Sequence, residues 1–339
     1  MERKMASIRR ITSLSPIQGA DFIELAQVDG WKTVVKKGLH KEGDFVVYCE
    51  IDSWIPKTLV PDLSRGDKVR TYEGIEGERL RTIKLRGQIS QGLIIPLNET
   101  PLELGTIEEG QDVSEELGII KWEHPENLFV RGGEAKGNFP SFIRKTDQER
   151  FQNIDKDYPV GKLFEVTEKL EGSSMTCYLQ NDVFGVCSRN YDLKDSDENA
   201  FWATAKKFRI EDLMRRYNLE GYALQGELVG PKIQNNIYGF SEYRFFVFDV
   251  FDIKKGSYMK PCERTALVKV VLGLGHAPIL GCFEYKEGNL VEGRDPLSFA
   301  EGKSVLNPKI EREGLVFKCT QEEYSFKAIS NKYLLKKKD

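Results

Sequence analysis

One stretch, residues 164–178 (FEVTEKLEGSSMTCY), constrains the fold of this chain more than any other. Bulky or β-branched residues alternate with polar ones before Lys169, and a second alternation runs through Met175 and Cys177. A period of two is typical of a half-buried strand, and a glycine such as Gly172 lets the backbone turn between two strands. The stretch therefore predicts two strands with Lys169 held between them, a position that suits a covalent lysine nucleophile.

The pattern Lys-x-x-Gly is weak evidence by itself, because both residues are common and a match is expected about once or twice by chance in a chain of this length. The chain contains a second match, Lys84-Leu85-Arg86-Gly87. Only the sequence around each lysine can separate the two. Four further strand-like segments follow Lys169, whereas none of them lies near Lys84.

These four segments combine strand patterns with glycines, carboxylates and lysines. They are Leu224–Gly230 with Glu227, Phe245–Val250 with Phe248, Glu313–Lys318, and Ser325–Ser330 with Lys327. Together with the Lys169 stretch, their order resembles motifs I, III, IIIa, IV and V of the covalent nucleotidyltransferase superfamily of ATP-dependent ligases and mRNA capping enzymes. The run GELVGPKIQ at residues 226–234 is similar to the nick-sealing RNA ligases in particular.

Composition indicates a globular protein without a membrane segment. The chain has 339 residues, 40% hydrophobic and 30% charged, which allows two domains with sizeable cores. A net charge of −3 argues against a generally basic nucleic-acid coat, although it permits a local basic groove. The six cysteines form no Cys-x-x-Cys pair, so neither a zinc site nor a disulfide framework is indicated. Without a secretory leader or an apolar run of membrane-spanning length, we expect an intracellular protein, cytoplasmic or nuclear.

Residues 1–120 predict an all-β domain. An alternating strand at residues 22–28 runs into Asp29-Gly30, a hairpin signal, and returns at residues 31–35; another strand covers 45–49. Short strands at this spacing predict a small barrel of the OB type. The phrase GADFIELAQVDGW is similar to OB domains of the tRNA-binding type and to the amino-terminal domain of one RNA ligase branch.

A cationic strand is predicted at residues 79–86, where apolar residues alternate with Arg79, Arg81, Lys84 and Arg86. One interpretation is a solvated strand face, the common fate of Lys and Arg. The other is a groove that follows the RNA backbone. On either interpretation Lys84 is a groove or surface lysine, not a nucleophile.

A linker is expected at residues 121–143, which are rich in Gly and Pro, followed by a nucleotidyltransferase domain at 144–339. Residues 144–153 predict a helix, and the resemblance places Arg150 toward the ATP phosphates; a surface helix is the alternative. One or two amphipathic helices are predicted between Asp197 and Asn218. The predicted fold class is α+β, an OB-fold β-barrel followed by an ATP-grasp-like ligase domain with antiparallel sheets.

The resemblance implies that Lys169 attacks the α-phosphorus of ATP. Because a free lysine with a pKa of about 10.4 is protonated at neutral pH, its pKa must be lowered by nearby cations and a dry pocket. Lys318, Lys327 and a bound metal are the cations available, and they would also stabilise charge on the phosphate. The family's motif V usually reads Lys-x-Lys, but Ser325 takes the first position here, which puts one phosphate contact in doubt.

The remaining site residues are also implied by the resemblance. Glu313, Glu171 and Glu227 would engage Mg²⁺ or Mn²⁺ or its waters, and Glu227 would alternatively contact the ribose. Phe248 would stack on the adenine, although a strand this apolar could be core, and Glu168 would read the adenine amino group. Arg189 would grip a phosphate or the ribose.

The sequence thus predicts an ATP-dependent RNA ligase that seals 3′-hydroxyl and 5′-phosphate ends of RNA, in nicked duplexes, as a monomer. The alternatives are an ATP-dependent DNA ligase, a capping guanylyltransferase, and a catalytically degenerate RNA-binding protein. An OB-type domain placed before the motifs favours the RNA ligase, since DNA ligases and capping enzymes usually carry it after them. The RNA that is repaired, and its tolerance of DNA strands, cannot be inferred.

Overall fold

A computed structural model describes residues 3–63, 69–102, 105, 107–123, 134–154, 160–286 and 290–336. The described residues fall into two compact units. Unit 1 is drawn from residues 1–124, 151–156 and 334–339, and unit 2 from residues 125–150 and 157–333. In the described ranges, no helix is both long enough and apolar enough to cross a membrane.

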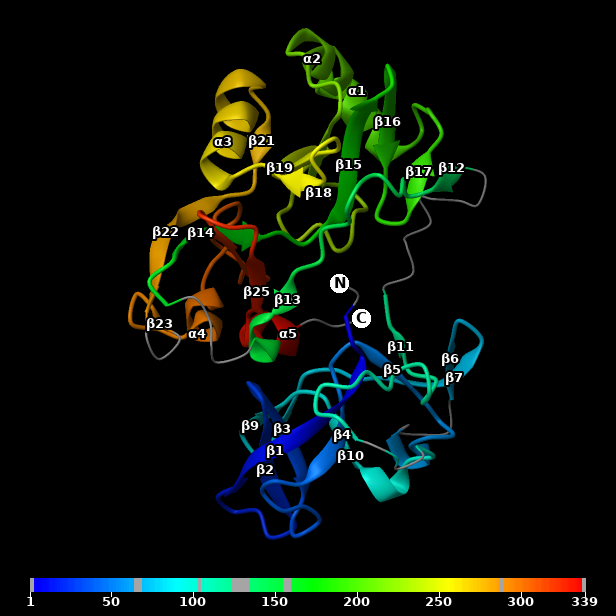
Figure 1. Ribbon diagram of the computed structural model, residues 1–339, viewed down its shortest axis with the longest axis vertical. Coiled ribbons are helices and arrows are strands. Elements are labelled where there is room, and N and C mark those ends of the chain that lie inside the picture. Colours follow the sequence, from blue (N-terminus) through cyan, green and yellow to red (C-terminus); the bar gives the residue numbers. More distant parts are fainter. Residues whose placement is uncertain are drawn as a thin grey trace. The chain divides into compact units, whose positions relative to one another are not determined.

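The regular secondary structure of unit 1 consists mainly of strands. One sheet has the order β10-β4-β1-β2-β3, a second has the order β11-β5-β7-β6, and β8 pairs with β9 (Figure 1). The strands are β1 Ala6–Pro16, β2 Ile23–Val28, β3 Trp31–Lys36, β4 Phe45–Cys49, β5 Ser53–Pro56, β6 Arg70–Tyr72, β7 Ile75–Arg79, β8 Ile83–Leu85, β9 Gln88–Ser90, β10 Leu93–Pro96 and β11 Ile120–Lys121. Short 3-10 helices lie at Pro61–Leu63, Leu97–Glu99 and Phe151–Asn153. The predicted Asp29-Gly30 hairpin joins β2 to β3, as Val28 pairs with Trp31.

The cationic strand predicted at residues 79–86 is wrong as a continuous element. β7 ends at Arg79, and β8 begins only at Ile83. Between them Leu80 is buried in the core of unit 1, and its backbone bonds to residues 52 and 53. The chain therefore changes partners at Leu80, which an alternating pattern alone does not reveal.

Unit 2 contains two sheets and most of the helices. The larger sheet has the order β12-β17-β16-β15-β18-β19-β20 with β21 beside β19, and the smaller has the order β13-β25-β24-β14-β22-β23. The strands are β12 Ala135–Asn138, β13 Glu149–Arg150, β14 Leu163–Lys169, β15 Ser173–Gln180, β16 Val183–Cys187, β17 Tyr191–Leu193, β18 Tyr222–Val229, β19 Arg244–Asp252, β20 Ser257–Tyr258, β21 Gly275–His276, β22 Ile279–Lys286, β23 Leu290–Val291, β24 Gly314–Cys319 and β25 Ser325–Ile329. The helices are α1 Ala200–Lys207, α2 Ile210–Arg216, α3 Pro261–Thr265, α4 Pro296–Ala300 and α5 Asn331–Lys336, with a π-helix at Ala266–Val271. The last three residues of α5 belong to unit 1.

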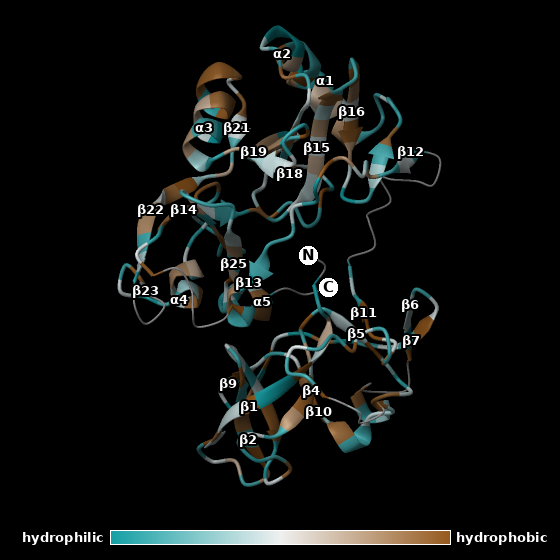
Figure 2. Ribbon diagram, in the orientation of Figure 1, coloured by the Kyte–Doolittle hydropathy of each residue, from teal (hydrophilic) through white to brown (hydrophobic). Residues whose placement is uncertain are grey.

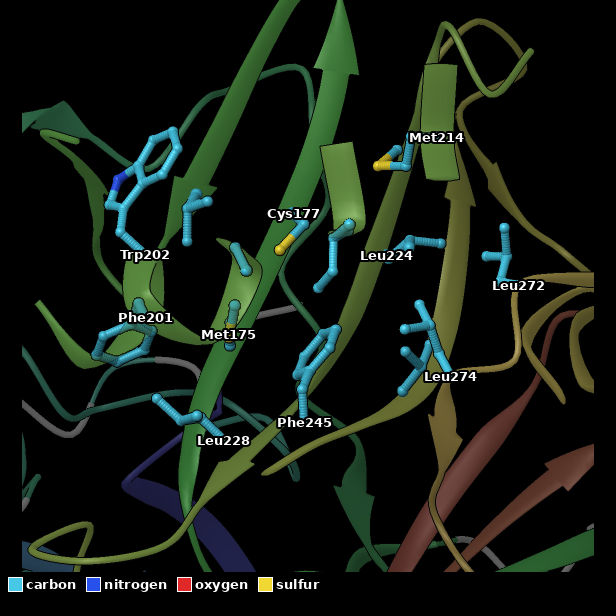
Figure 3. Packing of buried hydrophobic residues seen from close by; sticks show 14 of the residues in the cluster. Met175, Cys177, Phe201, Trp202, Met214, Leu224, Leu228, Phe245, Leu272 and Leu274 are labelled. Atoms are coloured by element: carbon cyan, nitrogen blue, oxygen red, sulfur yellow. The ribbon is translucent and has the colours of Figure 1, made fainter. Parts of the chain in front are cut away.

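The helices predicted between Asp197 and Asn218 are confirmed as α1 and α2. Asn199 caps α1 by accepting hydrogen bonds from two backbone amides, those of Phe201 and Trp202. Apolar side chains of both helices pack with those of β15, β18 and β19 in the main core of unit 2 (Figure 3). In Figure 2 the strand β16 is coloured as hydrophobic, whereas α2 is mostly hydrophilic.

The helix predicted at residues 144–153 is wrong. Residues 144–148 have no regular structure, Glu149–Arg150 form β13, and a 3-10 turn follows. β13 runs parallel to β25, with Arg150 opposite Lys327, so the sheet satisfies backbone groups that a helix would have bonded internally. Part of the predicted 121–143 linker, residues 124–133, lies outside the described residues; Ala135–Asn138 pair with β17.

Candidate active site

Lys169 lies where the chain passes from one sheet of unit 2 to the other. It ends β14 in the smaller sheet, paired with Gly314, and Leu170–Gly172 lead into β15 of the larger sheet. Glu227 on β18 lies opposite Ser174 of β15, and Glu313 directly precedes β24. The two sheets thereby bring together residues that are far apart in sequence.

The ammonium of Lys169 is held by carboxylates. Its Nζ lies 2.7 Å from Glu313 Oε1, and the lysine side chain is 29% exposed. Burial by itself lowers the pKa of Lys169, and Arg150 acts in the same direction, but the carboxylates of Glu313 and Glu227 outweigh both and raise it. The expected lowering of this pKa by Lys318 and Lys327 is therefore wrong, since neither lysine is among the groups that shift it most.

Glu227 is a half-buried carboxyl group with a strongly altered pKa. Burial raises the pKa of Glu227 to about 8, with Glu313 adding to the effect, while Lys169, Arg189 and a hydrogen bond from the Gly172 backbone oppose it. The carboxyl group of Glu227 can therefore change its protonation state near neutral pH, and an approaching cation would favour the charged carboxylate. Perturbed groups of this kind concentrate at functional sites.

Gly172 explains why the Lys-x-x-Gly motif needs its glycine. A Cβ atom there would lie 2.4 Å from the Leu228 carbonyl oxygen and 2.7 Å from Glu227 Cγ. Such contacts are too close for any side chain, so the glycine lets β15 approach the strand that carries Glu227.

Two buried glutamates flank Lys169. Glu171 donates its backbone amide to the Tyr238 hydroxyl over 2.7 Å. Glu168 accepts a hydrogen bond from the Val305 amide through Oε2, and its buried Oε1 has no hydrogen-bond partner among the residues that the structure describes. Burial raises the pKa of Glu168 against the hydrogen bonds from Ser304 and Val305. A buried acceptor oxygen whose hydrogen bond is not satisfied fits the predicted recognition of the adenine amino group by Glu168.

Phe248 is half-buried and packs in a cluster that also contains Leu170, Phe246 and Leu306. Phe246 and Phe248 share one face of β19, as predicted, while Phe245 and Val247 point into the main core. The cluster adjoins Glu168, because Val305, which donates to Glu168, is next to Leu306. A flat ring and a carboxylate acceptor are thus available together.

Lys318 of β24 is buried and contacts two residues of β19. Its Nζ lies 2.6 Å from Asp249 Oδ1 and donates to the Phe248 carbonyl over 2.7 Å. Burial lowers the pKa of Lys318 to about 8, although Asp249 opposes the shift. The structure therefore shows Lys318 holding the backbone beside Phe248.

Arg264 of α3 completes this buried network. It is fully buried, ion-pairs with Glu165 of β14, lies 3.6 Å from Asp249 Oδ1 and donates Nε to His276 Nε2 over 3.1 Å. Burial and the Arg264 charge lower the pKa of His276 to about 4, so this imidazole is neutral and can accept. The network ties β14, β19 and β21 to α3. The sequence analysis missed it, because a buried arginine outside the motifs has no local signature.

Two of the predicted phosphate ligands, Lys327 and Arg189, are brought together around one carboxylate, that of Asp147. Lys327 Nζ lies 2.9 Å from Asp147 Oδ1, and Arg189 lies 3.5 Å from Asp147 Oδ2. Arg150 is 5% exposed and its charge acts on Lys169. Asp147 was also missed, since it lies 180 residues from Lys327 in the sequence.

The predicted RNA contacts in unit 1 separate into two groups. Arg79 lies 2.7 Å from Asp52 and over the ring of Trp122, and its side chain is only 9% exposed, so it stabilises the unit. Arg81 is half-buried. Lys84 and Arg86 are exposed on the β8–β9 hairpin.

The carboxylates fit a divalent cation only in part. Among the described residues no group of three or more His, Cys, Asp or Glu side chains is arranged to hold a metal ion. The carboxylates of Glu227 and Glu313 both interact electrostatically with Lys169, and they supply hard oxygen donors. Such a pair suits Mg²⁺ or Mn²⁺ completed by phosphate oxygens and water.

Comparison with known proteins decides the family. Residues 162–336, more than half of the chain, match the family model described as RNA ligase, and residues 5–97 match an OB-fold domain. The chain belongs to the RNA ligase family. The predicted α+β fold with an amino-terminal OB-fold domain is thereby confirmed for this ligase, as is the prediction of an RNA ligase enzyme. No curated protein matches the chain.

Solved structures of an RNA ligase from Naegleria gruberi are similar to this ligase over nearly its whole length. A mutant with AMP and manganese is 44% identical with a TM-score of 0.90, covering 98% of both chains. A structure with pyrophosphate is 45% identical with a TM-score of 0.90 and the same coverage. A mutant with ATP and manganese is 45% identical with a TM-score of 0.91, covering 99% of this chain and 100% of the other.

Proposed function

We propose that this RNA ligase is ATP-dependent and joins RNA 3′-hydroxyl and 5′-phosphate ends through an adenylate bound to Lys169. The observation that carries the proposal is the ammonium of Lys169 held 2.7 Å from Glu313 at the junction of two sheets. Its setting in a chain similar to ligases solved with ATP, AMP, pyrophosphate and manganese supports ATP as the substrate and Mn²⁺ or Mg²⁺ as the metal.

The first step needs the neutral amine. Glu313 Oε1, which accepts the hydrogen bond from Lys169 Nζ, is positioned to take its proton. The Nζ lone pair then forms a bond to the α-phosphorus of ATP, and the bond to the bridging oxygen breaks, so that pyrophosphate leaves with the electron pair. Glu227 and Glu313 would hold a divalent cation, whose positive charge would favour the neutral amine and stabilise charge on the phosphates.

The next two steps transfer the adenylate to RNA. An oxygen of the RNA 5′-phosphate attacks the α-phosphorus, the phosphorus–nitrogen bond breaks and Lys169 regains its proton. The RNA 3′-hydroxyl then gives its proton to water and forms a bond to the phosphorus of the 5′-phosphate. The phosphorus–oxygen bond to the adenylate breaks, so that AMP leaves with the electron pair. Glu168 and Phe248 bind the adenine, while Arg189, Lys327 and Arg150 bind phosphate oxygens. We further propose that the RNA is a nicked duplex, that Lys84 and Arg86 contact its backbone, and that the ligase is a monomer.

Mass spectrometry of the full-length protein incubated with ATP and Mn²⁺ tests this proposal. We expect one added adenylyl group at Lys169, removed by excess pyrophosphate and absent from Lys169→Met. A protein that never acquires this group overturns the proposal and supports a degenerate RNA-binding protein.

Substrate variants test the two other enzyme classes. Labelling by GTP in place of ATP would indicate a capping enzyme. Equal sealing of nicks that end in ribose or deoxyribose would indicate a DNA ligase. We expect adenylyl transfer from ATP only, and faster sealing at a ribose end.

A further inference from the structure

Asp147 links two cations that come from different sheets. Arg189 lies in the turn between β16 and β17 of the larger sheet, and Lys327 lies on β25 of the smaller one. The two carboxylate oxygens of Asp147 face different partners, Oδ1 toward Lys327 at 2.9 Å and Oδ2 toward Arg189 at 3.5 Å. One carboxylate thus occupies the position between two cations in which a phosphate group would bind.

The backbone on both sides of Asp147 is anchored. The Arg144 carbonyl accepts hydrogen bonds from Gln225 Nε2 at 2.9 Å and from the Tyr258 hydroxyl at 3.1 Å. On the other side, Glu149 and Arg150 pair with β25. The carboxylate is therefore presented to its partners at high effective concentration. Its side chain is nevertheless 28% exposed, so it can rotate toward solvent without movement of the anchored backbone.

The charges explain why such a carboxylate is needed. The side chain of Lys327 is only 11% exposed, and a buried cation without a counter-ion is costly. A phosphate supplies the opposite charge when a nucleotide is bound. Before the nucleotide binds, and again after pyrophosphate leaves, another anion has to supply the negative charge that balances Lys327.

We propose that Asp147 is the internal counter-ion of the phosphate subsite formed by Arg189 and Lys327, and that it competes with ATP and pyrophosphate for these cations. The inference rests on the proposed function of the two cations. Competition lowers the affinity for both polyphosphates. It also speeds the release of pyrophosphate, because the returning carboxylate opposes rebinding of the pyrophosphate just released.

Equilibrium binding tests the inference without catalysis. In the Lys169→Met background, which leaves ATP intact, we compare Asp147→Asn with Asp147 by calorimetry, using ATP with Mn²⁺ and then pyrophosphate with Mn²⁺. Removing one negative charge beside the phosphates should tighten binding of both ligands roughly 3- to 10-fold. Because the effect is electrostatic, we expect it to shrink as salt is raised.

Asp197→Asn is the matched control. Asp197 also pairs with a lysine, Lys206 at 2.6 Å, but is 87% exposed and belongs to no part of the proposed site. This variant should bind both ligands like its parent. Asp147→Ala repeats the test should the asparagine variant fold poorly.

The outcomes separate the inference from the proposed function. Unchanged or weaker polyphosphate binding by both Asp147 variants overturns the inference, since the carboxylate would then orient the cations without competing. If the Lys169→Met protein binds no ATP and the unmodified ligase acquires no adenylyl group, the proposed function fails as well.

Discussion

The two Lys-x-x-Gly sequences of this ligase have the same local pattern, but one lies in an exposed hairpin and the other is packed against a neighbouring strand. Lys84 lies on the β8–β9 hairpin, where Arg86 and Gly87 have φ values of 47° and 83° and nothing lies within 4 Å of a Cβ added at Gly87. Gly172, three residues after Lys169, is packed against β18. A glycine that only turns the chain makes an exposed loop, whereas one that admits a neighbouring strand brings carboxylates to the lysine.

Replacing the lysine of each motif should give the largest difference in adenylylation between the two motifs. Lys169→Met should abolish transfer of AMP from radiolabelled ATP to the protein, a loss of at least about 10⁴-fold, because the variant lacks the amine proposed as the nucleophile. Lys84→Met should label normally. Label retained in the first variant, or lost in the second, would reverse the assignment.

Loss of each glycine should give the next largest difference. In Gly172→Ala, the Cβ placed 2.4 Å from the Leu228 oxygen forces β15 and β18 apart. Overpacking of this kind costs about 1–3 kcal/mol, and adenylylation should fall with it. Gly87→Ala should cost about 1 kcal/mol through its positive φ alone and leave adenylylation intact. Urea unfolding and the labelling assay measure the two effects, and equal adenylylation by both variants would contradict the packing argument.

The pKa of Lys169 gives a smaller, directional test. Because Glu313 raises this pKa, Glu313→Gln should lower it and leave more neutral amine at a given pH. An amine-specific reagent at pH 8 without ATP should therefore modify Lys169 faster in the variant, as quantified by peptide mass spectrometry. Lys84 in the same sample is the internal reference and should react at an unchanged rate. Unchanged or slower modification of Lys169 in the variant would show that Glu313 does not raise its pKa.

The smallest effect is expected on RNA binding by the hairpin. Lys84→Ala with Arg86→Ala should weaken duplex binding modestly and reduce the slope of log K against log salt by up to about 0.9 for each phosphate that is no longer neutralised. Adenylylation should not change. If fluorescence anisotropy across a salt series shows the same slope, the hairpin cations form only a solvated face.

Much of the fold could be predicted because its signals are local. The alternation before Lys169 predicts β14, the Asp29-Gly30 signal predicts the β2–β3 hairpin, and apolar spacing after Asp197 predicts α1 and α2. The failures lie where a distant partner decides. Residues 144–153 carry helix-forming side chains, yet pairing of β13 with β25 overrides that preference.

The sequence by itself determined the order of the strands and the candidate residues they carry, since period, turn glycines and motif order depend on neighbours in the chain. Only the tertiary structure decided which charges meet. Lys169 donates a hydrogen bond to Glu313, which is 144 residues away in the sequence, and Lys327 donates one to Asp147, which is 180 residues away. Such pairs depend on sheet register, and Coulomb interactions depend on distance in space. The physical state of each site lysine therefore follows from the packing of two sheets and not from its motif.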